Sequence, residues 1–396
     1  MWIIGLQTLV VSAVATWVAT PVVVRIAHRV GAVDLPGPRK VHAAPIPRIG
    51  GLAVFIGFVA GLLFAAFATG YLGNAERPRV GYWAVLGLAA VGMLLLGLLD
   101  DVRPVAFQWK FAAQVVAGTA VWAAGFRVEV ISWPFTNDAL QLGLWSLPVT
   151  VFWIVGITNA FNLIDGLDGL AAGTALITTT TVAILGVYGG HVAVSAISVA
   201  LAGSLVGFLR HNFNPARIFL GDSGSLFLGF TLAVISIHGS QKNVTAVAVL
   251  APLLVMGYPI LDTLLSVARR LNYLREDSAQ QGGLLYIARN MQRVFLPDRG
   301  HVHHRLLELG LSHRGAVLAL YMCAAALAAG ALAIVIVNSL VVALVLAGTL
   351  ALLTTGFFAY VLVRARAARR RRATSVDVSP PTPTGRLASG GAPGRN

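Results

Sequence analysis

The sequence predicts an all-α, polytopic integral membrane protein with about eleven transmembrane helices. Of the 396 residues, 57% are hydrophobic and only 11% are charged, against about 25% charged in ordinary soluble domains. The mean hydropathy is +0.80, and apolar windows of membrane-spanning length recur along the chain. The net charge of +14 would suit a nucleic-acid surface only on a solvated protein, so we expect no nucleic-acid partner.

A helix that crosses the hydrocarbon core needs about 20 mostly apolar residues. The first window has no Lys or Arg before Arg25 and is too long for a signal-peptide core, so we expect it to be retained as a helix. Residues 1–363 are expected to form the transmembrane catalytic domain, and the basic, Pro- and Gly-rich residues 364–396 a disordered tail. The eleven windows are 2–24, 49–70, 81–99, 107–125, 146–164, 170–189, 191–209, 223–240, 244–262, 315–337 and 340–363.

The orientation follows from the basic residues. An odd number of spans places the termini on opposite sides, and the basic tail is expected to stay in the cytoplasm, with the N-terminus outside. This choice puts 25 of the 29 Lys and Arg on the inner side. Acidic residues do not follow this rule, yet 12 of 15 lie on the same side. We therefore expect one active site from the inner loops, which are about 25–48, 100–110, 159–169, 210–222 and 263–314.

Adjacent carboxylates end the third apolar window, at Asp100 and Asp101. Like charges this close repel each other, so a cation or a shared proton is their natural partner. Mg²⁺ is the first candidate because it prefers carboxylate oxygens and bridges to phosphates, with Mn²⁺ as a substitute. The alternative is a pair of solvated acids at the start of a loop.

Two further inner turns carry acids among glycines. Asp165 and Asp168 are three residues apart and share a face if their turn is helical, with the carboxamide of Asn162 nearby. Asp222 lies in the sequence GDSGS, where free backbone, hydroxyls and a helix N-terminus would attract a phosphate or a metal. The alternative is plain helix capping at each turn.

Basic groups lie on the same predicted side. Arg39, Lys40 and His42 precede two prolines that stiffen the first inner loop, although ordinary positive-inside charge also accounts for the cations.

The long inner loop holds Arg299, His301, His303 and His304. Zinc binding is disfavoured because no cysteine accompanies the histidines and the i, i+4 spacing of a helical zinc site is missing. We therefore favour a phosphate or pyrophosphate clamp, with zinc and a purely structural role as alternatives.

Taken together, the motifs resemble those of the polyprenyl-phosphate N-acetylhexosamine-1-phosphate transferase superfamily over about residues 39–315. The histidine motif GHVHHRLLELG is similar to the branch that transfers GlcNAc-1-phosphate, whereas the muramoyl-pentapeptide branch usually carries a Pro-led run of three consecutive histidines. The resembling segments are RKVHAAPIPRIGG (39–51), LLDD (98–101), NAFNLIDGLDGLAAG (159–173), NPARIFLGDSGSLFLG (214–229), PILDT (259–263) and DRGHVHHRLLELGLSHR (298–314).

This resemblance implies Mg²⁺-dependent transfer of GlcNAc-1-phosphate from UDP-GlcNAc to undecaprenyl or decaprenyl phosphate, giving polyprenyl-pyrophosphoryl-GlcNAc and UMP. Such a reaction is the first membrane step of a cell-wall or surface glycan. It implies a cell (plasma or inner) membrane enzyme whose active site faces the cytoplasm, and it leaves a homodimer open. A phospho-N-acetylmuramoyl-pentapeptide transferase is the alternative. An ion-coupled transporter is a distant one, because the acids cluster on one side instead of at the midplane.

Motif positions also imply roles for single residues. Asp222 would be the main Mg²⁺ ligand, supported by Asp101. The predicted catalytic carboxylates are Asp100, Asp101, Asp165 and Asp168, and Asp262 in PILDT is a weaker candidate. The predicted substrate-binding residues are Arg39, Lys40, His42, Asn162, Asn212, Phe219, Arg299, His301, His303 and His304, of which Asn212 and Phe219 would contact the uridine.

Overall fold

The computed structural model describes residues 2–36, 44–70, 80–132, 139–240, 253–281 and 302–337, and positions 341, 345, 348 and 349. Within these residues the protein is a helical bundle with two small antiparallel sheets. Strand β1 (Val33–Asp34) pairs with β2 (Ile46–Pro47), and β3 (Val130–Ser132) pairs with β4 (Ala139–Gln141). The all-α prediction is confirmed, because both sheets are confined to connections between helices.

The helices coincide with the predicted spans within a few residues, apart from two windows. About half of 244–262 lies outside the described residues, and only four positions of 340–363 are described. Among the described residues, seven helices are long and apolar enough to cross a membrane, so the multi-spanning prediction is confirmed in that form. The total of eleven and the orientation stay predictions. The helices are α1 (Trp2–Val30), α2 (Gly50–Ala68), α3 (Val80–Val102), α4 (Phe107–Ala123), α5 (Ser146–Ile164), α6 (Leu170–Tyr188), α7 (Val192–Asn212), α8 (Gly221–Ser240), α10 (Gly257–Gln281), α12 (Val302–Glu308) and α13 (His313–Val337).

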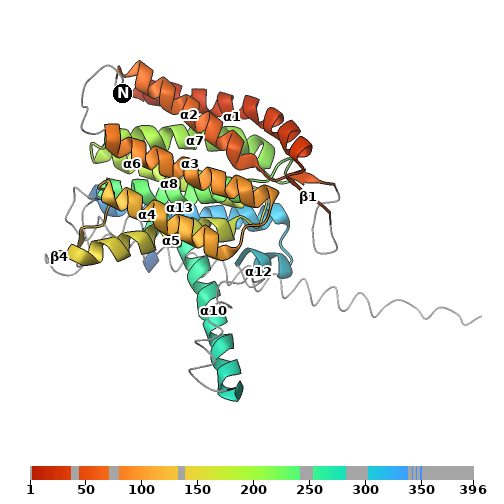
Figure 1. Ribbon diagram of the computed structural model, residues 1–396. Coiled ribbons are helices and arrows are strands. Elements are labelled where there is room, and N and C mark those ends of the chain that lie inside the picture. The colour runs from red at the N-terminus through yellow and green to blue at the C-terminus, as the bar shows by residue number, and fades with distance from the viewer. Residues whose placement is uncertain are drawn as a thin grey trace, which may run out of the picture.

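Most helices run side by side in one bundle (Figure 1). Helix α1 packs against α2 and α7, and α8 packs against α2, α3, α5 and α6. Residues 223–237 of α8 are all buried, as expected of a helix that is apolar all round and surrounded by others. The helix thus begins at the half-buried Gly221 and Asp222 and enters the interior from Ser223 onward.

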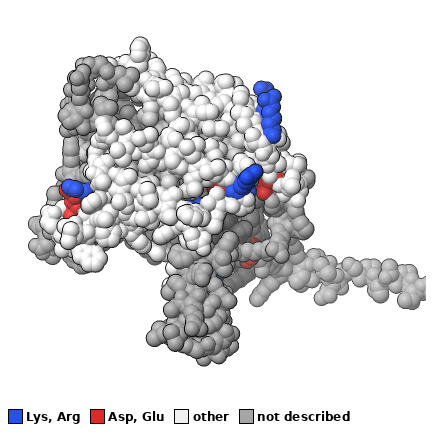
Figure 2. Space-filling view, viewed as in Figure 1, with Lys and Arg blue, Asp and Glu red and all other residues white. Residues whose placement is uncertain are grey.

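The surface of the bundle is mostly uncharged. Figure 2 shows a broad band of uncharged residues, with the visible charged side chains mainly toward the two ends of the bundle. Large apolar side chains such as Leu63, Phe67 and Phe152 are exposed, which is the pattern of a surface that faces lipid. The backbone polar groups of such helices are satisfied internally, so they can cross the hydrocarbon core.

The prediction that residues 263–314 form one loop is wrong, because two helices lie within this range. Helix α10 continues from Gly257 to Gln281 and projects away from the bundle (Figure 1), and α12 occupies Val302–Glu308. The segment after Thr263 alternates apolar residues with Arg, Asn, Glu and Gln. These residues favour helix formation as much as apolar ones do, but they fall below the hydropathy of a membrane span. A search for apolar windows therefore misses this extension.

Helices α3 and α8 approach each other closely at Gly97. A Cβ atom added there would overlap the carbonyl oxygen of Asp222 and the Cα of Ser223. The absence of a side chain at Gly97 thus lets the end of α3 lie directly against the first turn of α8.

We expect Gly97→Ala to destabilise the protein by about 1–3 kcal/mol, because the added methyl group must push α3 and α8 apart. Gly92→Ala is the matched control on the same helix, since a Cβ at Gly92 would meet nothing within 4 Å. Thermal unfolding of the two purified variants in detergent measures the difference. Equal melting temperatures would contradict the close approach of the two helices.

Candidate active site

The N-terminus of α8 is capped by carboxylates from other parts of the chain. Asp101, at the end of α3, accepts the Asp222 N–H at Oδ1 and the Ser223 N–H at Oδ2, each at 3.0 Å. The Gly221 N–H donates to Asp165, which follows α5. The first N–H groups of a helix have no acceptor within the helix, so these two acids supply the acceptors. The capping fixes where α8 begins relative to α3 and α5.

Asp101 has a further partner. Arg48 Nε lies 3.2 Å from Asp101 Oδ1, and the Asp101 side chain is fully buried. Both carboxylate oxygens are thus committed to donors within the protein, which is the arrangement of a positioning residue. Its predicted roles as a catalytic group and second metal ligand stay predictions.

Asp100 and Asp222 meet at a lysine. The Lys110 Nζ lies 3.0 Å from Asp100 Oδ2 and 3.1 Å from Asp222 Oδ2. The other oxygen of Asp100 accepts the Val105 N–H at 2.6 Å. Asn162 Nδ2 donates to Asp222 Oδ1 at 3.0 Å. One ammonium group therefore compensates two carboxylates from different helices, and we call Asp100, Lys110 and Asp222 the charge cluster.

Lys110 is a member of this cluster that the sequence analysis did not single out. Positive-inside charge accounts for one lysine near the end of a span, so the sequence analysis did not consider Lys110 as a site residue. A usable signal was present, because Lys110 is the one charged residue in the window 107–125. Its position alone does not indicate a partner, and only the fold shows that it contacts Asp100 and Asp222.

The remaining acids of the inner turns lie beside the charge cluster. Burial raises the pKa of Asp165 well above its usual value, and the nearby Asp222 and Asp101 carboxylates raise this pKa further. Asp168 Oδ2 accepts the Asn214 Nδ2 at 2.8 Å and the Ala216 N–H at 3.0 Å. Asp168 therefore holds the loop between α7 and α8. The structure brings the three acidic inner segments together at one place.

The predicted uridine contacts lie on that loop between α7 and α8. The buried Asn212 donates its Nδ2 to the Ile218 carbonyl oxygen at 2.9 Å. The half-buried Phe219 donates its N–H to the Pro47 carbonyl oxygen at 2.8 Å. These bonds attach the loop to α7 and to strand β2. The uridine-binding roles of Asn212 and Phe219 stay predictions.

Asp262 contacts the start of α12, the helix that carries His303 and His304. Its buried side chain accepts the Val302 N–H at Oδ1, at 2.8 Å. Val302 is the first residue of α12, so Asp262 fixes the start of the helix that carries His303 and His304. Of those two histidines the structure describes the backbone alone. The predicted residues Arg39, Lys40, His42, Arg299 and His301 lie outside the described residues.

The sequence matches glycosyl transferase family 4 over residues 83–240, the segment that contains the charge cluster. A relative named "Probable undecaprenyl-phosphate N-acetylglucosaminyl 1-phosphate transferase", from Bacillus subtilis (strain 168), is 40% identical over 313 residues, which cover 79% of this chain and 80% of the relative. The chain belongs to glycosyl transferase family 4. The predicted family and the prediction of a transferase are thereby confirmed.

Two more relatives of this family 4 transferase show which of the two branches it resembles more. The "Decaprenyl-phosphate N-acetylglucosaminephosphotransferase" of Mycobacterium tuberculosis (strain CDC 1551 / Oshkosh) is 36% identical over 364 residues, covering 86% of this chain and 84% of the relative. The "Phospho-N-acetylmuramoyl-pentapeptide-transferase" of Clostridium perfringens (strain SM101 / Type A) is 32% identical over 243 residues, covering 58% of this chain and 73% of the relative. Similarity to the N-acetylglucosamine branch is therefore both higher and more extensive.

The donor set of this family 4 transferase fits Mg²⁺ held jointly with a substrate. Among the described residues, no group of three or more His, Cys, Asp and Glu side chains lies close enough to hold a metal alone. Mg²⁺ does not require one, because it is usually bound through one or two carboxylates, several waters and substrate phosphates. Asp100 and Asp222 supply two carboxylates that already share one positive charge, that of Lys110.

Proposed function

We propose that this transferase moves GlcNAc-1-phosphate from UDP-GlcNAc to the phosphate of undecaprenyl or decaprenyl phosphate, releasing UMP. The observation that carries the proposal is the charge cluster at the half-buried start of α8, where the ends of apolar helices meet. The acceptor's isoprenoid chain must stay in lipid while its phosphate meets a water-soluble donor. A site at the helix ends satisfies both requirements. The extended match to N-acetylglucosamine transferases supports the same donor.

The chemistry is a single displacement at phosphorus. An oxygen of the lipid phosphate attacks the β-phosphorus of UDP-GlcNAc, the bond from that phosphorus to the bridging oxygen breaks, and UMP leaves with the electron pair. A phosphate monoester has a second pKa near 6, so the acceptor is already mostly dianionic at neutral pH. A strong general base is not needed. Detection of a phosphorylated enzyme after incubation with UDP-GlcNAc alone would contradict the single displacement.

Positioning and charge neutralisation supply most of the catalysis in such transfers. Asp222 and Asp100 would hold Mg²⁺, which when bound neutralises charge on the pyrophosphate. Lys110 would bind a phosphate oxygen and keep the reacting group against the two carboxylates. Asn162 orients Asp222 through the hydrogen bond at Oδ1. Asp101 would hold the backbone of Asp222 in place through its bonds to the Asp222 and Ser223 N–H groups.

The proposed location is the plasma membrane, with the charge cluster facing the cytoplasm. This side is supported by the excess of Lys and Arg, 25 of 29, in the segments that share it. A homodimer stays a prediction.

We expect Lys110→Gln to lower kcat/KM by about 10²–10³-fold, the usual cost of removing one preorganised electrostatic group from such a site. Arg103→Gln is the matched control, because Arg103 is an exposed cation at the end of α3, close to the same site. UMP release by the purified proteins measures both. A folded Lys110→Gln protein with the rate of the Arg103 variant would remove Lys110 from the proposed role.

The donor is tested by UMP release from the detergent-purified protein with Mg²⁺ and undecaprenyl phosphate, comparing UDP-GlcNAc with UDP-MurNAc-pentapeptide. Release with UDP-GlcNAc alone, abolished by EDTA, is the expected result. Release only with the pentapeptide donor would establish the muramoyl alternative. No release with either donor, in a folded sample, would contradict transfer from these two donors to undecaprenyl phosphate and would point to a different donor or acceptor.

A further inference from the structure

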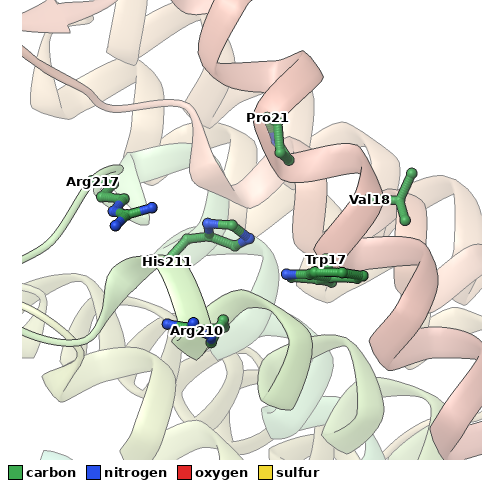
Figure 3. Close-up of a pocket in the computed structure, with 6 residues that line it drawn as sticks. All are labelled: Trp17, Val18, Pro21, Arg210, His211 and Arg217. Atoms are coloured by element: carbon green, nitrogen blue, oxygen red, sulfur yellow. The ribbon is translucent and has the colours of Figure 1, made fainter.

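A cavity with basic residues in its lining lies between α1 and α7, apart from the charge cluster. Its volume is about 450 Å³, within the range of sites that bind small molecules. Figure 3 shows the six side chains that line it. Helix α1 contributes Trp17, Val18 and Pro21, the last turn of α7 contributes Arg210 and His211, and the following loop contributes Arg217.

The cavity has a cationic side and an apolar side. Both guanidinium groups are on exposed residues, and in the described part of the chain no ion pair involves either of them. Figure 3 shows the His211 ring between Arg217 and Trp17. The His211 Nε2 is buried and has no hydrogen-bond partner among the described residues. Two permanent positive charges therefore line the same cavity, beside the His211 ring.

The chemistry of these groups favours a phosphate. Guanidinium groups bind phosphate oxygens through paired hydrogen bonds and stay charged at all physiological pH values. The opposite wall is formed by an indole, a valine and a proline, which have no charge to offer a fully soluble anion. A ligand that fits both walls has a phosphate joined to an apolar part.

The position of the cavity selects a lipid as that ligand. Helix α7 ends at Asn212, directly after Arg210 and His211, and it is one of the helices suited to cross a membrane. Trp17 and Val18 are 53% and 59% exposed, and Val14 and Val22 on the same helix are also exposed. Tryptophan and arginine at a span end are the groups that contact lipid headgroups at the bilayer surface. Hydrocarbon chains can lie along α1 while the headgroup enters the cavity.

We propose that this cavity binds the phosphodiester headgroup of an anionic phospholipid from the surrounding bilayer. Arg210 and Arg217 hold the phosphate, and Trp17 packs on the glycerol and the upper acyl chain. This inference does not depend on the transfer reaction, because none of the six lining residues contacts the charge cluster. The two sites share the loop between α7 and α8: the Arg217 N–H donates to the His211 carbonyl oxygen at 2.8 Å, while Asp168 accepts the Ala216 N–H.

The test uses the full chain reconstituted in phosphatidylcholine vesicles that contain an equal mole fraction of brominated phosphatidylglycerol or brominated phosphatidylcholine. Bromine quenches nearby tryptophans, and subtracting the signal of Trp17→Phe isolates Trp17. We expect the association constant of phosphatidylglycerol at Trp17 to exceed that of phosphatidylcholine about tenfold, because each basic group near the surface attracts an anionic lipid. Equal quenching by the two lipids would overturn the proposal.

Substitutions of basic residues test whether the preference for phosphatidylglycerol at Trp17 depends on Arg210 and Arg217. Arg210→Gln with Arg217→Gln is expected to abolish it, and Arg217→Gln alone, on an exposed loop residue, to reduce it severalfold while leaving the fold unperturbed. Arg29→Gln is the matched control on α1, because Arg29 is exposed but does not line the cavity. A preference that survives both substitutions, or that Arg29→Gln removes, would contradict the assignment.

Two competitors distinguish other sources of phosphate. Unbrominated polyprenyl phosphate at a low mole fraction should leave the quenching unchanged. If it displaces brominated phosphatidylglycerol selectively, the cavity is an acceptor site and the proposal is wrong. Millimolar inorganic phosphate should likewise have no effect, and relief of quenching by it would show a site for a soluble anion.

Discussion

Asp222→Asn is expected to lower the rate of sugar-phosphate transfer by about 10³-fold or more, a loss of several kcal/mol of transition-state stabilisation. A neutral carboxamide is a poor Mg²⁺ ligand, and it removes one of the two negative charges that Lys110 compensates. The side chain keeps its size and its reach toward Asn162. The variant therefore tests charge at this position with little change in shape.

The fold should survive this change. The bond that fixes α8 to Asp101 is made by the backbone N–H of residue 222, which the substitution retains. UMP release and thermal unfolding of the same preparations measure activity and stability together. Glu129→Gln is the matched control, because its carboxylate lies in an exposed pair with Arg127 at 2.7 Å, outside the proposed site. Near-normal turnover by a folded Asp222→Asn protein would exclude Asp222 as the main metal ligand.

Asp101→Ala is expected to give the opposite balance, a loss of about 3–5 kcal/mol in the free energy of unfolding. The substitution leaves Arg48 without its carboxylate and two helix N–H groups without acceptors. Transfer activity should fall as a consequence, because the backbone of Asp222 is no longer held in place. Asp101→Asn, which keeps one acceptor oxygen, should lie between Asp101→Ala and the unmodified protein.

The two substitutions thus have contrasting expected effects: Asp222→Asn lowers activity but not stability, and Asp101→Ala lowers stability first. Thermal unfolding in detergent, with UMP release measured on the same sample, separates a positioning role from a catalytic one. Asp100→Ala serves as the comparison, since Asp100 bonds to Lys110 and the Val105 N–H but does not accept the backbone N–H groups of Asp222 and Ser223, which bond to Asp101. If Asp101→Ala were inactive but as stable as the unmodified protein, the sequence-based assignment of Asp101 to the metal would be favoured.

Hydropathy predicted the spans well because crossing a membrane constrains composition strongly. The bounds of α5, Ser146–Ile164, are those predicted from the sequence, and α8 begins two residues before its predicted start. Hydropathy did not predict the part of α10 after Thr263, because this segment is polar enough to resemble a loop. Length and apolarity detect a helix in lipid, but they do not detect a helix that leaves the bundle.

The acids of the site were predictable as a group, but the division of labour among them was not. Asp100 and Asp101 are neighbours in the sequence, and residue spacing alone does not show which carboxylate points to Lys110 and which to the start of α8. Asp168 likewise resembles Asp165 in the sequence, yet it bonds to the loop between α7 and α8. These roles depend on contacts between segments far apart in the chain.

The contacts at the start of α8 join segments that are synthesised at different times. Asp222 lies 121 residues after Asp101, 112 after Lys110 and 60 after Asn162. During synthesis all three partners therefore leave the ribosome before Asp222 does. A nascent chain that stops before α8 has no complete charge cluster and can transfer nothing. The order of the segments thus delivers Asp222 last, when the groups that bond to it have already been made.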